Sequence, residues 1–207
     1  SITYADLVAR GFDIVGTPFD DQLFGTNVVD RITGGAGNDR LEGGEGDDTY
    51  FFNAGDGLDS VLDDAVAGAG NRVTFGSGII SDDVRLRLTE RPFDPSLSSL
   101  FLEIGTSGEG IRFDTFDPKD ALGLHPVEQF QFADGTTLTY SQLLDRGIEI
   151  SGTADNDALK GTNVNDRLDG GAGNDELRGD EGNDVYLFGH GSGQDVAIDR
   201  QGNLDAV

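Results

Sequence analysis

Apolar residues recur with a nine-residue period in two separate stretches of the chain. When the first residue of each nonapeptide is numbered one, position eight is apolar in all ten nonapeptides. Positions seven to nine predict a very short strand with a single inward side chain. Positions one to six are rich in glycine and aspartate and predict a turn. Strands this short are not stable alone, so we expect the repeats to stack in register as parallel sheets, two nonapeptides per coil.

The nonapeptides form two blocks that are 136 residues apart. The first block has repeats starting at Gly16, Gly25, Gly34, Gly43 and Ala54, and the second at Gly152, Gly161, Gly170, Gly179 and His190. In both blocks two extra residues precede the fifth repeat. The flanks keep the same offset, since ITYADLVARG from Ile2 matches LTYSQLLDRG from Leu138. We therefore expect the chain to be part of a longer array of such units.

The segment between the blocks has less glycine and longer alternating runs. Its pattern predicts strands over 71–76, 84–89, 100–104 and 111–116, and a loop around Arg91-Pro92 and Pro95-Ser96. Asp134-Gly135 predicts a hairpin between 127–133 and 136–139. Residues 140–146 predict a short helix that ends at Gly147.

These elements predict an all-β protein with two parallel β-rolls and a small β-rich domain, carrying a short helix, between them. We assign residues 1–15 to the end of a preceding unit or N-terminal cap and 16–62 to the first roll. Residues 63–149 are the middle domain, and 150–207 are the second roll of a truncated array.

Composition narrows the function classes. The net charge is -25, yet 36% of the residues are apolar and 13 are phenylalanine, which is too many for a disordered acidic tail. The excess of carboxylates disfavours nucleic acid and anionic membranes as partners and favours cations. The absence of cysteine excludes disulfides and thiolate metal sites. We find no apolar run of transmembrane length and no signal peptide at the N-terminus.

Position six is aspartate in every nonapeptide: Asp21, Asp30, Asp39, Asp48, Asp59, Asp157, Asp166, Asp175, Asp184 and Asp195. Stacked turns would bring these carboxylates together, and a hard divalent cation would remove their repulsion. Calcium suits such turns because it accepts about six to eight oxygens, backbone carbonyls included. Magnesium is less suited to this geometry, and zinc and iron are disfavoured by the absence of cysteine and by only two histidines.

The repeats GGAGNDRLE, GGEGDDTYF and GGAGNDELR resemble the GGxGxDxUx nonapeptide of RTX (repeats-in-toxin) proteins. The resemblance implies a right-handed parallel β-roll that binds Ca²⁺ in its turns, in an exported protein of a Gram-negative bacterium. Each ion would lie between repeats n and n+2, which allows about three ions per block. The implied pairs are Asp21 with Asp39, Asp30 with Asp48, Asp39 with Asp59, Asp157 with Asp175, Asp166 with Asp184 and Asp175 with Asp195.

Backbone carbonyls of the turns would complete each calcium shell. The candidates are Thr17, Phe19, Gly34, Gly35, Ala36, Gly37, Asn38, Gly43, Gly44, Glu45, Gly46, Asp47, Gly170, Gly171, Ala172, Gly173, Asn174, Gly179, Asp180, Glu181, Gly182 and Asn183. In the first two repeats of each block, other residues replace the second and fourth glycines. Whether those turns form sites is left open by the sequence.

The middle domain resembles the haemolysin-type calcium-binding related domain found beside RTX repeats. The segments GSGIISDDVRLRL, LFLEIG and VEQFQFADGTTLT carry this resemblance. Because rolls have open ends with bare strand edges, we expect this domain to act as a spacer or lid on the preceding roll.

The sequence predicts no catalytic residues. His125 and His190 have the context of loop residues, and the pairs Asp63-Asp64 and Asp82-Asp83 that of solvated loops or helix caps. A set of phenylalanines is interpreted as core, with a sugar-binding face as the alternative: Phe75, Phe101, Phe113, Phe116, Phe130 and Phe132.

We therefore expect a non-catalytic calcium-binding module of a secreted RTX protein, extracellular or on the cell surface. It would fold on meeting extracellular calcium and so support type I secretion and the stability of its parent. Its partners would be calcium ions and neighbouring repeat units. Two alternatives are an adhesin module that binds polysaccharide or a cell surface, and an accessory domain of a secreted enzyme.

Overall fold

The computed structural model describes residues 3–63, 70–91 and 94–199. The chain divides into two compact units, and each of them combines segments that are distant in sequence. The first unit contains Ser1–Arg85, Leu100–Thr115 and Leu124–Tyr140, and the second contains Leu86–Ser99, Phe116–Gly123 and Ser141–Val207.

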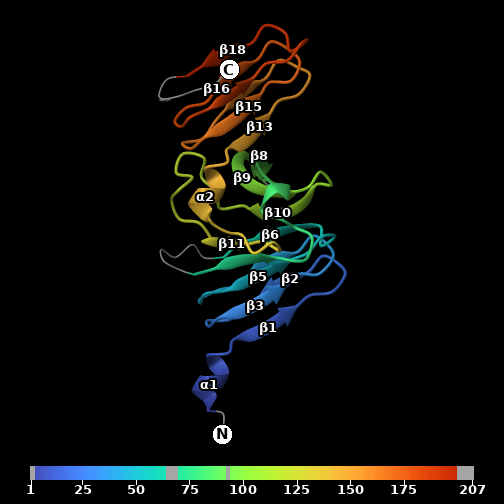
Figure 1. The fold of residues 1–207 in the computed structure, drawn as a ribbon, viewed down its shortest axis with the longest axis vertical. Helices are drawn as coiled ribbons and strands as arrows, with labels where there is room; N and C mark the ends of the chain where they lie inside the picture. The colour runs from blue at the N-terminus through green and yellow to red at the C-terminus, as the bar shows by residue number, and fades with distance from the viewer. Residues whose placement is uncertain (1–2, 64–69, 92–93, 200–207) are drawn as a thin grey trace. The chain divides into compact units, whose positions relative to one another are not determined.

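The first unit begins with helix α1 (Tyr4–Val8) and continues as two stacks of short strands. One stack follows the order β1 (Phe12–Val15), β3 (Asp30–Thr33), β5 (Thr49–Phe52), β7 (Arg72–Phe75), β11 (Gln129–Gln131) and β12 (Thr137–Thr139). The other contains β2 (Gln22–Phe24), β4 (Arg40–Glu42), β6 (Leu58–Val61), β10 (Glu109–Phe113) and residues 100–104 of β9 (Asp94–Ile104). Figure 1 shows β1, β3 and β5 stacked one upon another.

The strand register confirms two nonapeptides per coil. Ile32 of β3 pairs with Ile14 of β1 and with Tyr50 of β5, always in parallel and 18 residues apart. In the other stack Leu23 pairs with Leu41 at the same separation. Odd and even repeats therefore form opposite sheets, which is the β-roll that the nine-residue period predicts.

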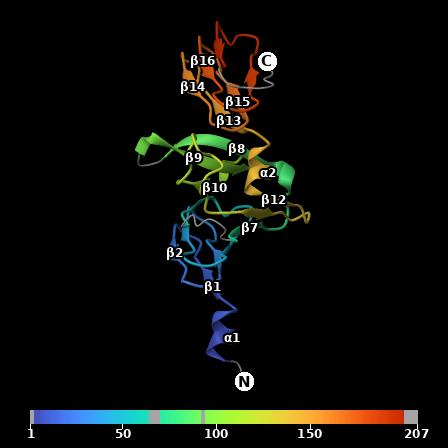
Figure 2. The same cartoon turned by 90° about the vertical axis from the view of Figure 1, so that its left-hand side faces the viewer.

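Strands β8 (Val84–Arg91), β13 (Ile148–Ser151), β15 (Asp166–Asp169) and β17 (Val185–Leu187) pair in this order in the second unit, β8 through Leu86 and Arg87. A further sheet there contains β14 (Ala158–Lys160), β16 (Glu176–Arg178) and β18 (Val196–Ile198), all parallel. Figure 2 shows β13 and β15 on one side of this roll and β14 and β16 on the other.

The side chains at position eight form a thin core inside each roll. At most 2% of the side chain is exposed for Ile32, Leu41, Tyr50 and Val61 in the first block and for Leu168, Leu177 and Tyr186 in the second. Each of these strands thus contributes one buried side chain, and the stack makes the core continuous, whereas Leu23 and Leu159 in the first coils are only half-buried. At the last coil, in contrast, Ala197 is exposed.

Most predicted elements of the middle segment are present. The hairpin joins β11 and β12 around Asp134-Gly135, and helix α2 (Tyr140–Leu144) ends where the Gly147 N–H donates to the Leu144 carbonyl at 2.9 Å. A short 3₁₀ turn, η1 (Ser81–Asp83), precedes β8. The strand predicted over 111–116 is present as β10 but ends at Phe113.

The loop predicted around Pro95-Ser96 is wrong, since β9 already begins at Asp94. Position 92 lies outside the described residues. β10 pairs only with residues 100–104 of β9, so Pro95 lies on a part of β9 where β10 requires no backbone N–H. Strand β9 therefore extends through residues that local propensity assigns to a loop.

The six phenylalanines that sequence analysis assigned to the core of the middle segment are buried, as predicted. Their exposed fractions lie between 0% for Phe130 and 8% for Phe101. Phe75 stacks on Phe132 with ring centroids 4.9 Å apart, and Phe113 meets Phe130 edge to face. These rings are not available as a sugar-binding face.

Candidate metal centre

The position-six aspartates form a hydrogen-bonded ladder in each roll. In the first three repeats of each block, the backbone N–H of the position-six aspartate donates to Oδ1 of the aspartate two repeats later. The distances are 2.8 Å for Asp21 to Asp39, 2.7 Å for Asp30 to Asp48, 3.0 Å for Asp39 to Asp59, 2.9 Å for Asp157 to Asp175, 3.0 Å for Asp166 to Asp184 and 3.1 Å for Asp175 to Asp195. The structure thus brings together all six pairs that the sequence pattern suggests.

The second carboxylate oxygen of several aspartates is buried without a hydrogen-bond partner. This holds for Oδ2 of Asp39, Asp48, Asp59 and Asp175, whose side chains are 0–2% exposed. Buried polar atoms nearly always have a hydrogen-bond partner, and a buried carboxylate oxygen without one destabilises the folded state. Each of these oxygens therefore has the properties of a ligand for a cation or for a proton.

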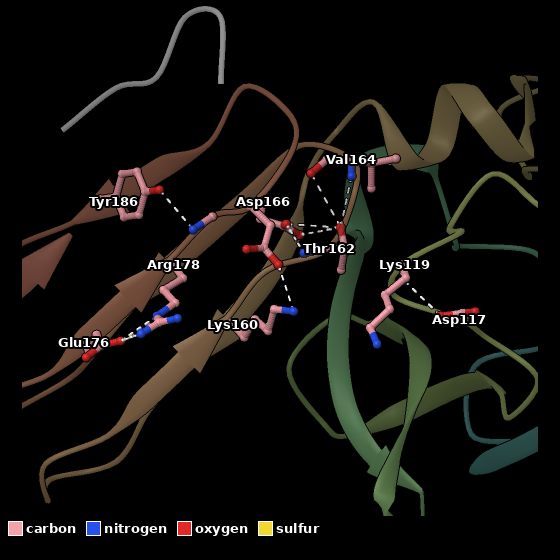
Figure 3. Close-up of polar contacts among 11 residues, drawn as sticks. Asp117, Lys119, Lys160, Thr162, Val164, Asp166, Glu176, Arg178 and Tyr186 are labelled. Atoms are coloured by element: carbon pink, nitrogen blue, oxygen red, sulfur yellow. Dashed lines mark hydrogen bonds and ion pairs between the residues drawn. The ribbon is translucent and has the colours of Figure 1, made fainter. Parts of the chain in front are cut away.

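In the first two repeats of each block, the residue at position two satisfies Oδ2 instead. Thr17 donates to Asp21 Oδ2 from its N–H at 2.6 Å and from its hydroxyl at 2.8 Å. Thr162 makes the same contacts with Asp166, as Figure 3 shows. Thr26 and Thr153 repeat the pattern. This role was not predicted, although threonine occurs at position two in all four of these repeats.

The glycines of the third and fourth repeats let the turns stack closely. A Cβ atom added at Gly35, where φ is +98°, would lie 2.6 Å from the carbonyl oxygen of Thr17. At Gly173, where φ is +132°, it would lie 2.5 Å from the carbonyl oxygen of Asp155. Only glycine fits both the backbone angle and the space. Backbone carbonyls of one repeat consequently lie directly against the turn of another.

Carbonyl and carboxylate oxygens converge beside the first residue of a repeat. The Gly34 carbonyl oxygen lies 2.1 Å, and Asp21 Oδ2 2.9 Å, from the point where a Cβ atom of Gly16 would lie. Corresponding oxygens converge at Gly25, Gly152 and Gly161. These donors are all oxygen and come from two stacked turns. Threonine already donates to the Oδ2 atoms at these four points, so the fit to a hard cation such as Ca²⁺ depends on the stacked carbonyl oxygens together with the unpartnered Oδ2 atoms of Asp39, Asp48, Asp59 and Asp175.

Burial shifts the acidity of several repeat aspartates. Loss of hydration raises the pKa of Asp48 to about 6 and that of Asp59 to about 7, and neighbouring carboxylates add to both shifts. Burial likewise raises the pKa of Asp166 to about 7 and of Asp184 to about 6. At half-buried Asp21 the pKa is lowered, because the Thr17 N–H and hydroxyl donate to the carboxylate. The buried turns therefore favour a proton or a cation beside each carboxylate.

Asn71, Asp63 and Tyr50 extend the ladder of the first block. The solvated loop or helix cap expected at Asp63 is wrong, because Asp63 is only 2% exposed and accepts hydrogen bonds inside the roll. Asn71 Oδ1 accepts from the Asp48 N–H at 2.7 Å, so Asn71 occupies position six of a further coil. Its Nδ2 donates to Asp63 Oδ2, and that same oxygen accepts from the Tyr50 hydroxyl at 2.7 Å. The signal in the sequence is the spacing Asn71-Arg72-Val73, which keeps a polar residue two places before an apolar one.

A second ladder runs along position five. The Asn38 N–H donates to Asp20 Oδ1 at 2.8 Å, and the Asn174 N–H donates to Asn156 Oδ1 at 2.9 Å. These side chains hold the stacked turns in register. Because their oxygens already accept backbone hydrogens, they stabilise the stack itself.

Within the described residues, no group of three or more His, Asp or Glu side chains is arranged to hold a metal. A cation in the turns must therefore take carbonyl oxygens in addition to paired carboxylates. His125 stacks on Tyr140 with ring centroids 4.0 Å apart, and His190 is exposed at the start of its repeat.

Two family models match the chain, one for the rolls and one for the middle segment. The model of the RTX calcium-binding nonapeptide repeat matches residues 24–58 and 151–186 in four copies. The model of the haemolysin-type calcium binding protein related domain matches residues 100–142. No curated protein matches the chain.

Among solved structures, the chain is similar to the extracellular lipase LipA from Serratia marcescens. The identity is 20% and the TM-score 0.38, over 81% of this chain and 29% of the lipase. This chain therefore spans less than a third of the lipase. Both α-helices of the described residues have five residues, and neither meets the length and hydropathy of a membrane-spanning helix.

Proposed function

This chain is an RTX repeat protein with a haemolysin-type calcium-binding related domain between its two repeat blocks, and we propose that its rolls fold when they meet extracellular calcium. RTX repeats identify it as a calcium-binding module of a secreted protein. The finer proposal is that calcium decides whether the rolls are folded. It depends on the buried, unpartnered Oδ2 atoms of the repeat aspartates.

The calcium sites that we propose lie between stacked turns. Each ion would take Oδ2 of a position-six aspartate together with carbonyl oxygens from the turn two repeats away. The six aspartate pairs of the ladders correspond to about three ions per block. Six divalent ions would reduce the net charge from -25 to about -13. Bound calcium would thus satisfy the orphaned oxygens and also weaken the repulsion along each roll.

Calcium binding then becomes folding free energy. The unfolded chain has no preformed site, so an ion that binds only the folded roll stabilises it by about 2.7 kcal/mol at one hundred times its dissociation constant. Extracellular calcium is on the order of 10⁻³ M, the range in which weak extracellular calcium modules bind. In the cytosol, where calcium is scarce, the rolls would stay unfolded. An unfolded chain suits export through a type I secretion channel of a Gram-negative bacterium.

Within this proposal, the division into rolls at 16–62 and 150–207 and a middle domain at 63–149 is retained. The matched repeat family is structural, which favours a supporting role over catalysis. The activity of the parent protein and a partner such as polysaccharide belong to the same class of proposals. Burial of the six described phenylalanines of the middle segment leaves no aromatic face among them in favour of an adhesin.

The test is far-UV circular dichroism of the whole chain during a titration from chelator to 10 mM calcium, with magnesium in parallel. We expect a cooperative gain of β signal with calcium and none with magnesium. A spectrum that is already folded in chelator and does not respond to calcium would refute the proposal.

A pair of matched double variants separates specific sites from general charge. Asp39→Asn with Asp175→Asn removes two buried Oδ2 atoms, whereas Asp82→Asn with Asp145→Asn removes two exposed carboxylates. Both double variants change the net charge equally. We expect Asp39→Asn with Asp175→Asn to increase the calcium concentration at which half of the chain is folded. We expect Asp82→Asn with Asp145→Asn to leave this concentration unchanged. Equal shifts would mean that calcium acts only by screening.

A further inference from the structure

The 136-residue duplication gives each element of the first roll a counterpart in the second. Strand β1 corresponds to β13, and helix α1 corresponds to α2. Strand β13 is paired on both edges, with β15 on one side and with β8 on the other. Strand β1 pairs with β3 and is the edge of its sheet among the described residues. The free edge of β1 therefore corresponds to the edge of β13 that β8 covers.

Burial follows this difference in pairing. Ile148 of β13 is 0% exposed, whereas its counterpart Phe12 in β1 is 45% exposed. Ile150 is 7% exposed, and its counterpart Ile14 is only half-buried. The apolar character of both positions is the same in the two strands. The two strands differ in their neighbours, because β8 pairs with one edge of β13 and no described strand pairs with the corresponding edge of β1.

Exposed apolar side chains also gather in the first coil. Val15, Phe19, Phe24 and Val29 are 70%, 76%, 58% and 38% exposed. Their counterparts in the second roll are all polar: Ser151, Asp155, Lys160 and Asn165. An uncovered sheet edge with apolar neighbours is a site of association. The first coil of this chain is thus more apolar than a solvent-facing coil needs to be.

We propose that the free edge of β1 is a docking surface for the β8 strand of another middle domain of this kind. The occupant is defined by the contact that the chain already contains, in which Ile148 lies opposite Leu86 and Glu149 opposite Arg87. In β1, Asp13 occupies the position of Glu149 and keeps its negative charge. The basic strand VRLRLTER would thus meet an acid at β1 in the same register as at β13, and this acid already pairs with Arg31 at 2.5 Å.

A second copy of the whole chain does not provide this occupant. Its β8 strand already pairs with its own β13. The docking partner is therefore the middle domain of an additional unit, whether in the same polypeptide or supplied separately. We accordingly expect the whole chain to remain monomeric in calcium.

The test extends the whole chain with one additional copy of residues 2–137, a full unit that keeps the roll on which its middle segment packs, placed directly before Ile2. This junction repeats the natural one, because Ile2 corresponds to Leu138. The chain has no cysteine, so a single pair can be introduced cleanly. We place one cysteine by Asp13→Cys in the original copy and the other by Arg87→Cys in the additional copy. Residue numbers refer to the original copy unless the additional copy is named. Parallel register partners lie within the Cα separation that a disulfide spans.

Two reference pairs calibrate the result. Glu149→Cys with Arg87→Cys in the original copy joins residues that are register partners. Asp13→Cys with Arg85→Cys in the additional copy is two residues out of register on the same strand. We expect the test pair to form a disulfide as completely as the first reference and at least ten times faster than the second. A test pair that forms no faster than the out-of-register pair, while the first reference forms, overturns the proposal.

Hydrogen exchange of the extended chain without cysteines provides a second readout. We expect the Phe12–Val15 amides to slow at least tenfold and to approach the rate of the Ile148–Ser151 amides. Unchanged rates at β1 beside a protected β13 would overturn the docking surface. Loss of protection at β13 as well would instead indicate that the rolls themselves are not folded. Self-association of the unextended chain that Phe12→Asp abolishes would show that a second copy occupies the surface, and would also overturn the proposal.

Discussion

Replacing Asp59 with asparagine should change the stability of the chain in opposite directions with and without calcium. Asp59 is 1% exposed, its Oδ1 accepts from the Asp39 N–H at 3.0 Å, and its Oδ2 is buried without a partner. Asparagine has nearly the same shape and keeps an acceptor for the ladder. It removes the charge and the one carboxylate oxygen that we assign to an ion.

The pKa of Asp59 gives the size of the effect without calcium. Burial raises this pKa from 3.8 to about 7, and each pKa unit corresponds to about 1.4 kcal/mol, so the ionised form costs the folded state at most about 4 kcal/mol. Solvent screening reduces this to about 2 kcal/mol. We therefore expect Asp59→Asn to increase the stability of the calcium-free roll by about 2 kcal/mol at pH 8.

Calcium reverses the sign because the variant binds one ion fewer. Well above the dissociation constant, every bound ion adds about 1.4 kcal/mol of stability for each tenfold increase in free calcium. The slope of the unfolding free energy against the logarithm of calcium should fall by that amount in Asp59→Asn. The two stability curves should then cross as calcium increases.

The assay is urea unfolding followed by circular dichroism at a series of free calcium concentrations. Asp56→Asn is the matched control from the same turn, because Asp56 Oδ2 already accepts from the Asn53 N–H at 2.7 Å. We expect this control to keep the wild-type slope. If Asp59→Asn also keeps that slope, Oδ2 of Asp59 is not a calcium ligand and the proposed site is wrong.

Three further predictions concern the turns and the acidity of the rolls. Gly173→Ala should lower the free energy of unfolding by about 1–3 kcal/mol in a urea titration, because φ is +132° there and a backbone oxygen lies 2.5 Å from the added carbon. Gly189→Ala, where the added carbon meets no atom within 4 Å, should leave the free energy of unfolding unchanged. Equal costs would contradict this account of the stacked turns. Tyr50→Phe should cost about 1–3 kcal/mol in thermal unfolding, since the hydroxyl joins a buried carboxylate to a backbone N–H, and an unchanged unfolding temperature would contradict this role. In chelator, acidification from pH 8 to pH 5 should increase the β signal in circular dichroism. The folded-state pKa of Asp59 is raised to about 7, so its contribution is fully present below the unfolded value of 3.8 and is lost as pH rises through 7. A β signal that falls over this interval would contradict the prediction.

The sequence alone determined the coil and the pairing of its aspartates. A strict nine-residue period with one apolar position allows only short strands that bury one side chain each, and such strands must stack. Two repeats per coil then place residues 18 apart in register, so the spacing by itself pairs Asp21 with Asp39. These conclusions are local, because they follow from a pattern repeated along one direction of the chain.

The tertiary structure alone decided how the middle segment continues the first roll. β11 adds to the stack beyond β7, although Phe130 and its partner Val73 are 57 residues apart and share no repeat pattern. The Pro95 region is also a strand, because it continues β9 beside β8, and this pairing outweighs the local propensity for a loop.

Only the structure shows which carboxylate oxygens accept a hydrogen bond and which are buried without a partner. Sequence spacing places an aspartate at position six in all ten repeats and treats them alike. In the folded turns, Thr17 satisfies Oδ2 of Asp21, whereas Oδ2 of Asp39 is buried with no donor in reach. The physical reason is that hydrogen bonding and desolvation depend on the atoms within a few ångströms, and close stacking of the turns determines which atoms those are.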